Sequence, residues 1–269
     1  MQLTPKKLHF VHQLARYGSC AIGAVYLMVG LIALLSLLRL RHGGADEGSI
    51  LAFFKSIPLG DVLVGVILLG MLCYITWRIF EAVTDPYAYG NRWKGITQRT
   101  GVVLSALAYA LIALSALQIL LNLPGPDVSG QPEAQRVLVA KIFQWRAGEW
   151  LVGIAGVIVA FVGLFQFIYA FRKDYEERLA MNRLSANKKK MIHVLAWIGH
   201  FARGIILLII AWFLIDAAIK SNPHEVVNTD KAFNYLGEHI GHPVFVLVAL
   251  GTMCYGCFMF ALGFYYDFH

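Results

Sequence analysis

The chain has 269 residues, of which 58% are hydrophobic and only 14% are Asp, Glu, Lys or Arg. Globular proteins carry about 25% charged residues, so this chain has too little polar surface to form a water-soluble particle. Its 8 prolines, its 4 cysteines and its 25 glycines without a period of three exclude the disordered, disulfide-scaffold and collagen-like classes. The composition therefore predicts an integral membrane protein that crosses the bilayer several times.

Six runs of sequence are long and apolar enough to cross a bilayer as helices, which requires about 20 apolar residues each. Pro243 is a favourable first helical residue for the last of them. An even number of spans places both ends of the chain on the same side of the membrane. The expected spans cover about residues 17–38, 60–82, 100–123, 150–171, 193–219 and 243–266.

The distribution of Lys and Arg predicts that this side is the cytoplasm. Loops and tails on the side of the N-terminus hold 14 of these residues near the spans, against 8 on the other side. Lys and Arg that flank short spans resist translocation. The same asymmetry accounts for the net charge of +7 without a nucleic-acid partner, and a basic inner face would attract anionic lipid. The first run exceeds the core of a signal peptide, so it is expected to remain as an anchor.

An internal repeat divides the chain into three hairpins of two spans each. A shift of 181 residues aligns the first hairpin with the last without a gap, so that Gly18 falls on Gly199 and Tyr74 on Tyr255. The middle copy fits with one indel, at a shift of 83 for its first helix and of 88 for its second. The expected repeat units are residues 1–90, 91–184 and 185–269.

The expected architecture is an all-α bundle of six transmembrane helices. Each hairpin enters the membrane from the same side, so the three copies are parallel and should be related by a pseudo-threefold axis along the membrane normal. Recurrent glycines in the spans allow the close helix approach that drives packing in lipid. Basic stretches at residues 4–14 and 185–195 are expected to lie in the inner membrane interface.

Characteristic small, aromatic and charged residues stand in two of the hairpins. In the first copy they are Arg16-Tyr17-Gly18, Gly23, Tyr26, Gly30, Tyr74, Trp77, Arg78, Glu81 and Ala82, and in the third copy they are Gly199, Arg203-Gly204, Gly241, Gly251 and Gly256. In combination they resemble the bacterial family called domain of unknown function 1206. The resemblance covers nearly the whole chain and implies a six-span protein of the bacterial inner membrane, without implying an activity. One departure is Trp197, which stands where the first two copies have Arg16 and Arg99.

A set of charged residues near the inner ends of the spans is a candidate ligand site. Arg203 lies near the middle of the fifth span, where a cation costs about 2.5 to 3.5 kcal/mol on insertion scales and therefore needs a partner or an aqueous route. If the set converges, it forms a basic vestibule that faces the cytoplasm and suits a phosphate or carboxylate. The alternative is that the arginines reach out to the inner headgroups. The candidate residues are Arg203, His200, Arg16, Arg99, Arg78 and Glu81.

A second candidate site lies at the outer ends of the second, fourth and sixth spans. The repeat places Asp61, Glu149 and His242 at equivalent positions, and His239 lies close by in sequence. Two carboxylates with imidazole suit a divalent metal. The alternative is that the acidic residues favour the positive ends of their helices. A haem held by His200 and His193 is a further alternative, but no cofactor is expected.

The expected function is non-enzymatic. The spans hold no lysine, their middle thirds hold no carboxylate, and the chain has no phosphate-binding loop or hydrolase motif. The leading hypothesis is a protein that binds an anionic lipid or passes a small solute through the vestibule. Its alternative is a scaffold or accessory subunit with a sealed core that docks another membrane protein. A third class, metal or haem binding, also stays open.

Overall fold

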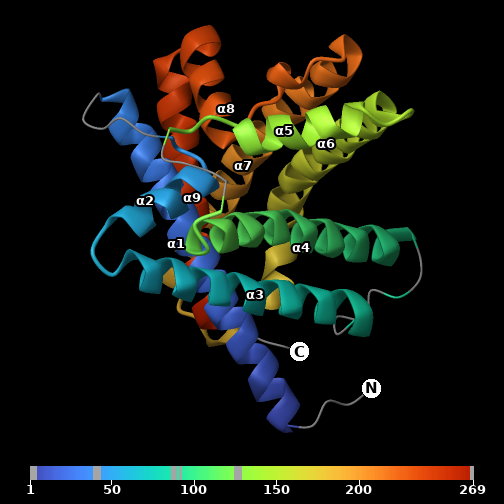
Figure 1. Cartoon of the computed structure of the whole chain (residues 1–269). Coiled ribbons are helices and arrows are strands. Elements are labelled where there is room, and N and C mark those ends of the chain that lie inside the picture. Colours follow the sequence, from blue (N-terminus) through green and yellow to red (C-terminus); the bar gives the residue numbers. More distant parts are fainter. Residues whose placement is uncertain (1–4, 39–43, 86–89, 91–92, 124–128, 267–269) are drawn as a thin grey trace.

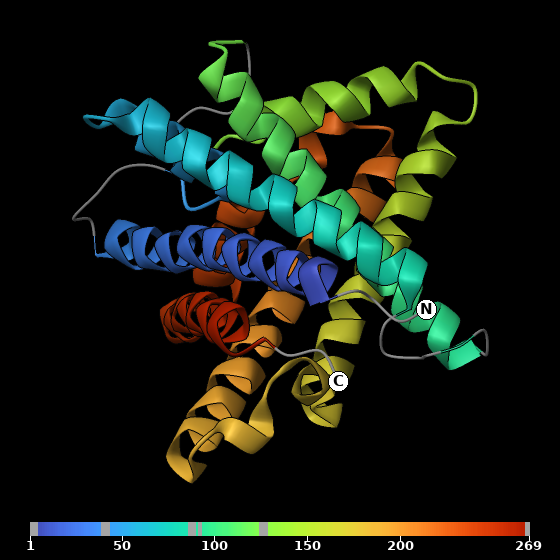
Figure 2. The same cartoon turned by 90° about the horizontal axis from the view of Figure 1, so that it is seen from below.

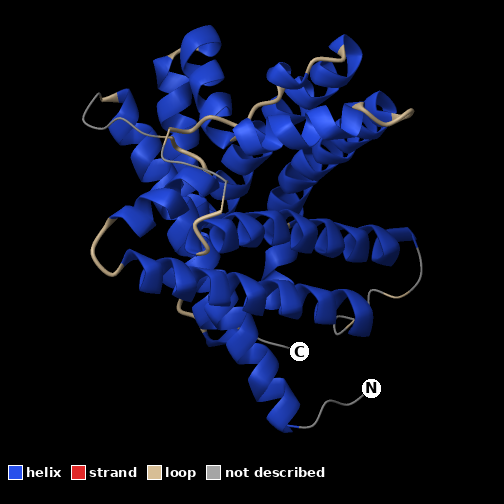
Figure 3. Cartoon of the chain, viewed as in Figure 1, coloured by secondary structure: helices blue, strands red, loops and turns tan. Residues whose placement is uncertain are grey.

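The structure is a computed structural model that describes residues 5–38, 44–85, 90, 93–123 and 129–266. Helices and the loops between them make up this described part, which contains no β-strand (Figure 3). The prediction of an all-α fold is therefore confirmed.

Six helices are long and apolar enough to cross a membrane, which makes the chain an integral membrane protein by length and composition. The first and fifth of them have 33 and 35 residues, about 50 Å at 1.5 Å per residue, so they extend beyond a hydrocarbon core of about 30 Å. The basic stretches expected in the interface belong to these two helices from residues 5 and 186 onwards; Ser185 is the N-cap of the second one, and residue 4 lies outside the described part. The six are α1 Pro5–Leu37, α3 Gly60–Thr84, α4 Trp93–Leu120, α6 Gly148–Arg172, α7 Ala186–Lys220 and α9 His242–Tyr265.

Short helices connect the long ones. Within the three hairpins the connections contain α2 Glu47–Ser56, then α5 Glu133–Phe143, and then η3 Pro223–Glu225, α8 Thr229–Tyr235 and the π-helical turn η4 Leu236–Ile240. Between the second and third hairpins lie two 3-10 turns, η1 Asp174–Arg178 and η2 Met181–Arg183.

The long helices pack in a recurring order. The first helix of each hairpin packs against the second helix of another hairpin, which pairs α1 with α9, α4 with α3 and α7 with α6. Two hairpins also pack internally, because α1 contacts α3 and α7 contacts α9. Figure 2 shows α1 lying between α3 and α9 as this order requires.

Glycines mark the equivalent contacts within the first and third hairpins. A Cβ on Gly18 would lie 2.6 Å from the Cα of Tyr74, and a Cβ on Gly199 would lie 2.6 Å from the Cα of Tyr255. These contacts are related by the shift of 181 residues, so the hairpin repeat of the sequence is a repeat of packing. In the middle hairpin α4 and α6 do not pack in this way, and the pseudo-threefold axis stays a prediction.

The N-terminal part of α1 and the C-terminal end of α9 lie at the same end of the bundle (Figure 1). The His12 ring is 5.8 Å from the ring of Tyr266, and the Trp77 ring is 5.0 Å from it. This arrangement fits an even number of spans.

The connections at the opposite end interlock across all three hairpins. The Ala45 N–H donates to the Asp230 carboxylate over 2.7 Å, and the Asn228 side chain donates to the Gly130 carbonyl over 3.1 Å. Asp46 caps α2 by accepting from the backbone N–H of Ser49 at 3.2 Å. Burial raises the pKa of Asp46 to about 6 and also raises the pKa of Asp230. Two buried carboxylates thus lie outside the membrane spans, in one layer of connections.

Candidate functional site

Arg203 lies in the interior of the bundle among three tyrosine rings from three other helices. Its guanidinium carbon is 4.4 Å from the ring centre of Tyr26 on α1, 4.9 Å from that of Tyr255 on α9 and 5.6 Å from that of Tyr109 on α4. The hydroxyls of Tyr109 and Tyr255 are 3.2 Å apart. The side chain of Arg203 is half-buried.

No acidic side chain in the described part of the chain forms an ion pair with Arg203. Each cation–π contact contributes about 0.5 to 2 kcal/mol, which offsets part of the cost of placing a cation in the middle of a span. A ring face is not a counter-charge, however, and the positive charge of Arg203 is left uncompensated. The position suits an anion supplied from outside the chain.

A buried triad of Glu81, Arg78 and Arg178 lies next to the tyrosine rings that surround Arg203. Glu81 on α3 accepts from Arg78 over 2.8 Å and from Arg178 over 2.6 Å, and its side chain is 1% exposed. The Tyr74 hydroxyl accepts from Nε of Arg78 at 2.8 Å, and the Tyr169 hydroxyl accepts from Arg178 at 3.1 Å. Such charge-assisted hydrogen bonds are about twice as strong as neutral ones, so the triad ties α3 to α6 and η1.

His200 lies between the triad and the tyrosine rings that surround Arg203. The ring is buried, its Nδ1 is 2.6 Å from Oε1 of Gln166 on α6, and the ring stands edge-on to Tyr169 and Tyr255 at 4.8 and 5.2 Å. Since an amide oxygen only accepts, Nδ1 is the donor of this bond and Nε2 is the acceptor of a neutral ring. Among the described residues Nε2 has no hydrogen-bond partner.

These residues form one continuous arginine–tyrosine cluster to which all six spanning helices and η1 contribute. Among the described residues it holds three guanidinium groups and one carboxylate; Glu81 pairs with Arg78 and Arg178, whereas Arg203 has no acidic partner there. A guanidinium without an acidic partner inside a membrane bundle favours a ligand that carries a phosphate or carboxylate. The members of the cluster are Arg203, Tyr26, Tyr109, Tyr255, His200, Tyr169, Arg178, Glu81, Arg78 and Tyr74.

The structure brings four of the six predicted vestibule residues into this cluster and leaves two outside it. Arg203, His200, Arg78 and Glu81 belong to it. Arg16 is exposed, with its guanidinium 5.0 Å from the Phe264 ring. Arg99 donates from Nε to the Ala82 carbonyl over 2.8 Å and lines a separate pocket of about 290 Å³ between α3 and α4.

Sequence reasoning missed Arg178 and the tyrosines. Arg178 counts only as one more loop cation in the sequence, since the fold alone brings it to Glu81, 97 residues away. The tyrosines did leave a signal, because Tyr26 and Tyr109 are equivalent in the first two copies and Tyr74 and Tyr255 in the first and third. A polar ring that recurs inside apolar spans is expected to face a polar partner.

The residues of the predicted outer ring do not come together. Asp61 is 73% exposed and lies 3.6 Å from Lys55, and Glu149 accepts from the Ser221 hydroxyl. The His239 ring stacks on Tyr235 with ring centres 4.4 Å apart. In the part of the chain that the structure covers, no three His, Cys, Asp or Glu side chains gather where they could hold a metal ion. The first-turn positions of Asp61 and Glu149 fit the helix-dipole explanation.

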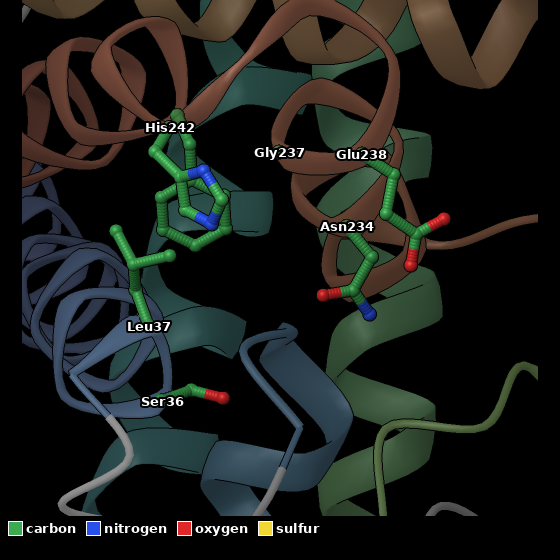
Figure 4. A pocket seen from close by; sticks show the side chains of 7 residues that line it. Ser36, Leu37, Asn234, Gly237, Glu238 and His242 are labelled. Carbon is green, nitrogen blue, oxygen red and sulfur yellow. The ribbon is translucent and has the colours of Figure 1, made fainter.

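His242 lines a surface pocket of about 400 Å³ at the end of the bundle formed by the connections. Figure 4 shows Glu238 and Asn234 on one side of this pocket and His242 on the other, with Ser36 from the end of α1 below them. The pocket shares no residue with the arginine–tyrosine cluster, so the two are separate features of the molecule.

The predicted haem ligands each have another partner. His193 hydrogen-bonds with the Tyr175 hydroxyl through Nδ1 over 3.0 Å, and its Nε2 lies 3.6 Å from Glu176. His200 is bonded to Gln166. The four cysteines are free and lie half-buried in the spans.

The fold and this cluster define a class: a six-span integral membrane protein of three tandem helical hairpins, with arginines in its interior. Comparison with known families gives three tandem matches to one family, over residues 17–85, 100–173 and 198–266. The chain belongs to this family, which is described as Domain of Unknown Function (DUF1206).

The chain is similar to a Bacillus subtilis (strain 168) protein called "Uncharacterized protein YxxB". The two are 25% identical over 257 residues, which cover 95% of this chain and 91% of the relative. No solved structure matches the chain. The resemblance predicted from the sequence is therefore confirmed, and the function has to be argued from the site.

Proposed function

We propose that this protein is a non-enzymatic inner-membrane protein, with both termini in the cytoplasm, that binds an anionic group at Arg203. The observation that carries the proposal is the guanidinium of Arg203, which lies in the interior among Tyr26, Tyr109 and Tyr255 without an acidic partner among the described residues. The triad of Glu81 with Arg78 and Arg178 lies in the same cluster.

The ligand is a group with a phosphate or carboxylate, carried by an anionic lipid of the inner leaflet or by a small solute. A guanidinium recognises both groups through paired N–H donors. The neighbouring tyrosine hydroxyls and Nε2 of His200 supply further hydrogen-bonding groups beside it. Because the loops on the side of the termini hold more Lys and Arg, we take that side as cytoplasmic and the cluster as lying nearer to it.

Replacing Arg203 with Leu tests the proposal. The substitution removes a charge that has no acidic partner in the described residues, so we expect the variant to fold. Its thermal stability in detergent checks this. Arg16→Leu is the matched control, because it removes one exposed arginine of the same charge outside the cluster.

The measurements are the anionic lipid that co-purifies with the protein and the flux of anionic solutes into proteoliposomes. We expect Arg203→Leu to lower at least one of these by about tenfold, the equivalent of about 1.4 kcal/mol, and Arg16→Leu to leave both within about twofold of the parent protein. Unchanged lipid and unchanged flux in Arg203→Leu would refute the anion site.

A second candidate function is a scaffold or accessory subunit with a sealed core. It is favoured by α6, the least covered of the six spanning helices, whose side chains Trp150, Phe161 and Phe171 are more than half exposed. Affinity purification from membranes in mild detergent distinguishes the two. A membrane protein that co-purifies in a fixed ratio with both the parent protein and Arg203→Leu supports the scaffold.

A further inference from the structure

In the described part of the chain, the six spanning helices pack in one continuous order whose two ends are α4 and α6. Neighbouring helices pack in the order α4, α3, α1, α9, α7 and α6, and each step in this order is an extensive contact. The two ends of the order, α4 and α6, belong to the same hairpin, yet they make at most isolated contacts in the described part of the chain. This boundary is called the seam below.

The two helices of the middle hairpin do not approach each other at the seam as closely as the helices of the other two hairpins do. Gly101 is the equivalent of Gly18 and Gly199, whose added Cβ atoms would collide with the backbone of the partner helix. A Cβ on Gly101 would instead meet a single atom, of the Phe165 ring on α6, at 4.0 Å. The middle hairpin thus keeps the glycine but lacks the close approach.

A pair of bulky residues explains the opening. In the first hairpin the Cβ position of Gly70 lies 2.4 Å from the Cβ of Ala21, a contact that only glycine permits, and Gly251 with Ala202 repeats it in the third hairpin. The family matches begin at 17 and 100 and end at 85 and 173, so the middle hairpin has Leu104 in place of Ala21 and Ile158 in place of Gly70. Leu104 and Ile158 cannot pack at that distance, and the two helices stay apart.

The seam borders the arginine–tyrosine cluster. Its two helices contribute Tyr109 of α4, which contacts Arg203, and Gln166 of α6, which bonds to His200. Arg203 is less completely buried than Arg78 and Arg178 in the triad. Of the boundaries in this packing order, the seam is the one next to Arg203 at which the two helices do not pack extensively in the described part of the chain.

We infer that an anionic phospholipid enters laterally through the seam, with its phosphate at Arg203 and an acyl chain between α4 and α6. This inference rests on the proposed anion site and names its ligand. Charge complementarity favours a lipid, because Arg203 has no acidic partner among the described residues while the seam residues Leu104, Ile158 and Phe165 are apolar. One molecule with an anionic head and an apolar tail satisfies both.

The Nε2 atom of His200 indicates which lipid headgroup fits the site. His200 precedes Arg203 by three residues, so the two side chains share one face of α7. Its buried Nε2 is an acceptor without a partner among the described residues. A buried acceptor left unpaired costs about 1 to 3 kcal/mol, and a hydroxyl on the lipid headgroup would remove that cost. Phosphatidylglycerol, which carries one phosphate and a hydroxylated headgroup, is therefore the probe of choice.

The experiment fills the seam without touching the cluster. Gly101→Trp places a large side chain at the seam, where an added Cβ meets a single atom at 4.0 Å, and Gly65→Trp is the matched control, since a Cβ on Gly65 of α3 meets no atom within 4 Å. A second variant, Leu104→Ala with Ile158→Gly, restores the small pair of the other hairpins and should let the seam close. Each protein in detergent is titrated with phosphatidylglycerol and, separately, with soluble glycerol phosphate.

We expect Gly101→Trp and the double variant to weaken phosphatidylglycerol binding by about tenfold, and Gly65→Trp to stay within about twofold of the parent protein. Glycerol phosphate, which needs no lateral entry, should bind all of them equally. Unchanged phosphatidylglycerol binding in both seam variants overturns lateral entry, and so does a parent protein that binds only the soluble headgroup. If Arg203→Leu binds both probes as the parent does, the anion site itself fails.

Two other occupants of the seam have distinct outcomes. If a second copy of the chain fills it, Gly101→Trp lowers the mass measured by light scattering and leaves phosphatidylglycerol binding unchanged. If phosphatidylcholine, which has no net charge, binds the parent protein as tightly as phosphatidylglycerol does, the seam takes lipid without regard to charge. Either result contradicts the inference.

Discussion

The carboxylate of Glu81 accepts a 2.6 Å hydrogen bond from Arg178, a residue 97 positions further along the chain. The bond joins the first hairpin to the turn that follows the second one. Since Glu81 also pairs with Arg78, a single buried carboxylate holds two guanidinium groups. Losing the carboxylate should therefore lower the stability of the fold by a different amount than losing one of the arginines.

Glu81→Gln should be more destabilising than Arg178→Met. The first change removes the carboxylate that two buried guanidinium groups share, whereas the second leaves the pair of Glu81 with Arg78 intact. Breaking a buried pair from one side costs about 3 to 5 kcal/mol. Unfolding in detergent measures both variants, and Lys220→Met at the exposed pair with Asp216 is a control that should change little. Equal stability of Glu81→Gln and the parent protein would show that the triad contributes nothing.

Stability should rise as the pH falls from 7 to about 4.5. Burial raises the pKa of Asp46 to about 6 from its ordinary value of 3.8, with Glu47 and Asp230 adding negative charge nearby and Ser49 opposing the shift by hydrogen bonds. The folded state therefore binds more protons than the unfolded state in this window, and unfolding becomes harder by about 1 to 3 kcal/mol as Asp46 is protonated.

Asp46→Asn isolates this effect. Asn keeps the N-cap of α2 but does not titrate, so the slope of stability against pH should flatten in the variant. Unfolding curves at several pH values in the same detergent provide the comparison. The assignment to Asp46 is wrong if the variant keeps the slope of the parent protein.

Gly199→Ala should destabilise the third hairpin. The added Cβ would lie 2.6 Å from both N and Cα of Tyr255, and backbone atoms cannot rotate away. Overpacking of this kind costs about 1 to 3 kcal/mol. Gly65→Ala has open space and gains up to about 1 kcal/mol of helix propensity, so thermal unfolding should move in opposite directions for the two variants. A shift of the same sign in both would contradict the close-packing explanation.

Both chain termini should react from the cytoplasmic side only. In a variant without native cysteines, a cysteine added after His269 should be protected from an impermeant maleimide applied to intact cells, and a cysteine at exposed Gln131 should be labelled. Permeabilised cells supply the control, because both sites should then react. Labelling of both cysteines, or of the C-terminal one alone, in intact cells would overturn the assigned orientation.

The cluster shows where prediction from the sequence ends. Arg203 with His200, and Arg78 with Glu81, could be found because each pair lies three residues apart on one helix face. Arg178 could not, because its partner is 97 residues away and only the packing of α6 and η1 against α3 brings them together. Arg16 and Arg99 illustrate the reverse case, in which residues with the same charge and a similar depth end up outside the cluster.

The sequence by itself determined the membrane class, the six spans and the three hairpins. These properties are local, since a span needs only enough apolar residues in a row and a repeat needs only equal spacing. The tertiary structure alone decided which helices touch. Whether two helices approach closely depends on side-chain volume at a few facing positions: Gly70 packs against Ala21 in the first hairpin, whereas the middle hairpin has Ile158 and Leu104 at the equivalent positions and its two helices do not pack closely.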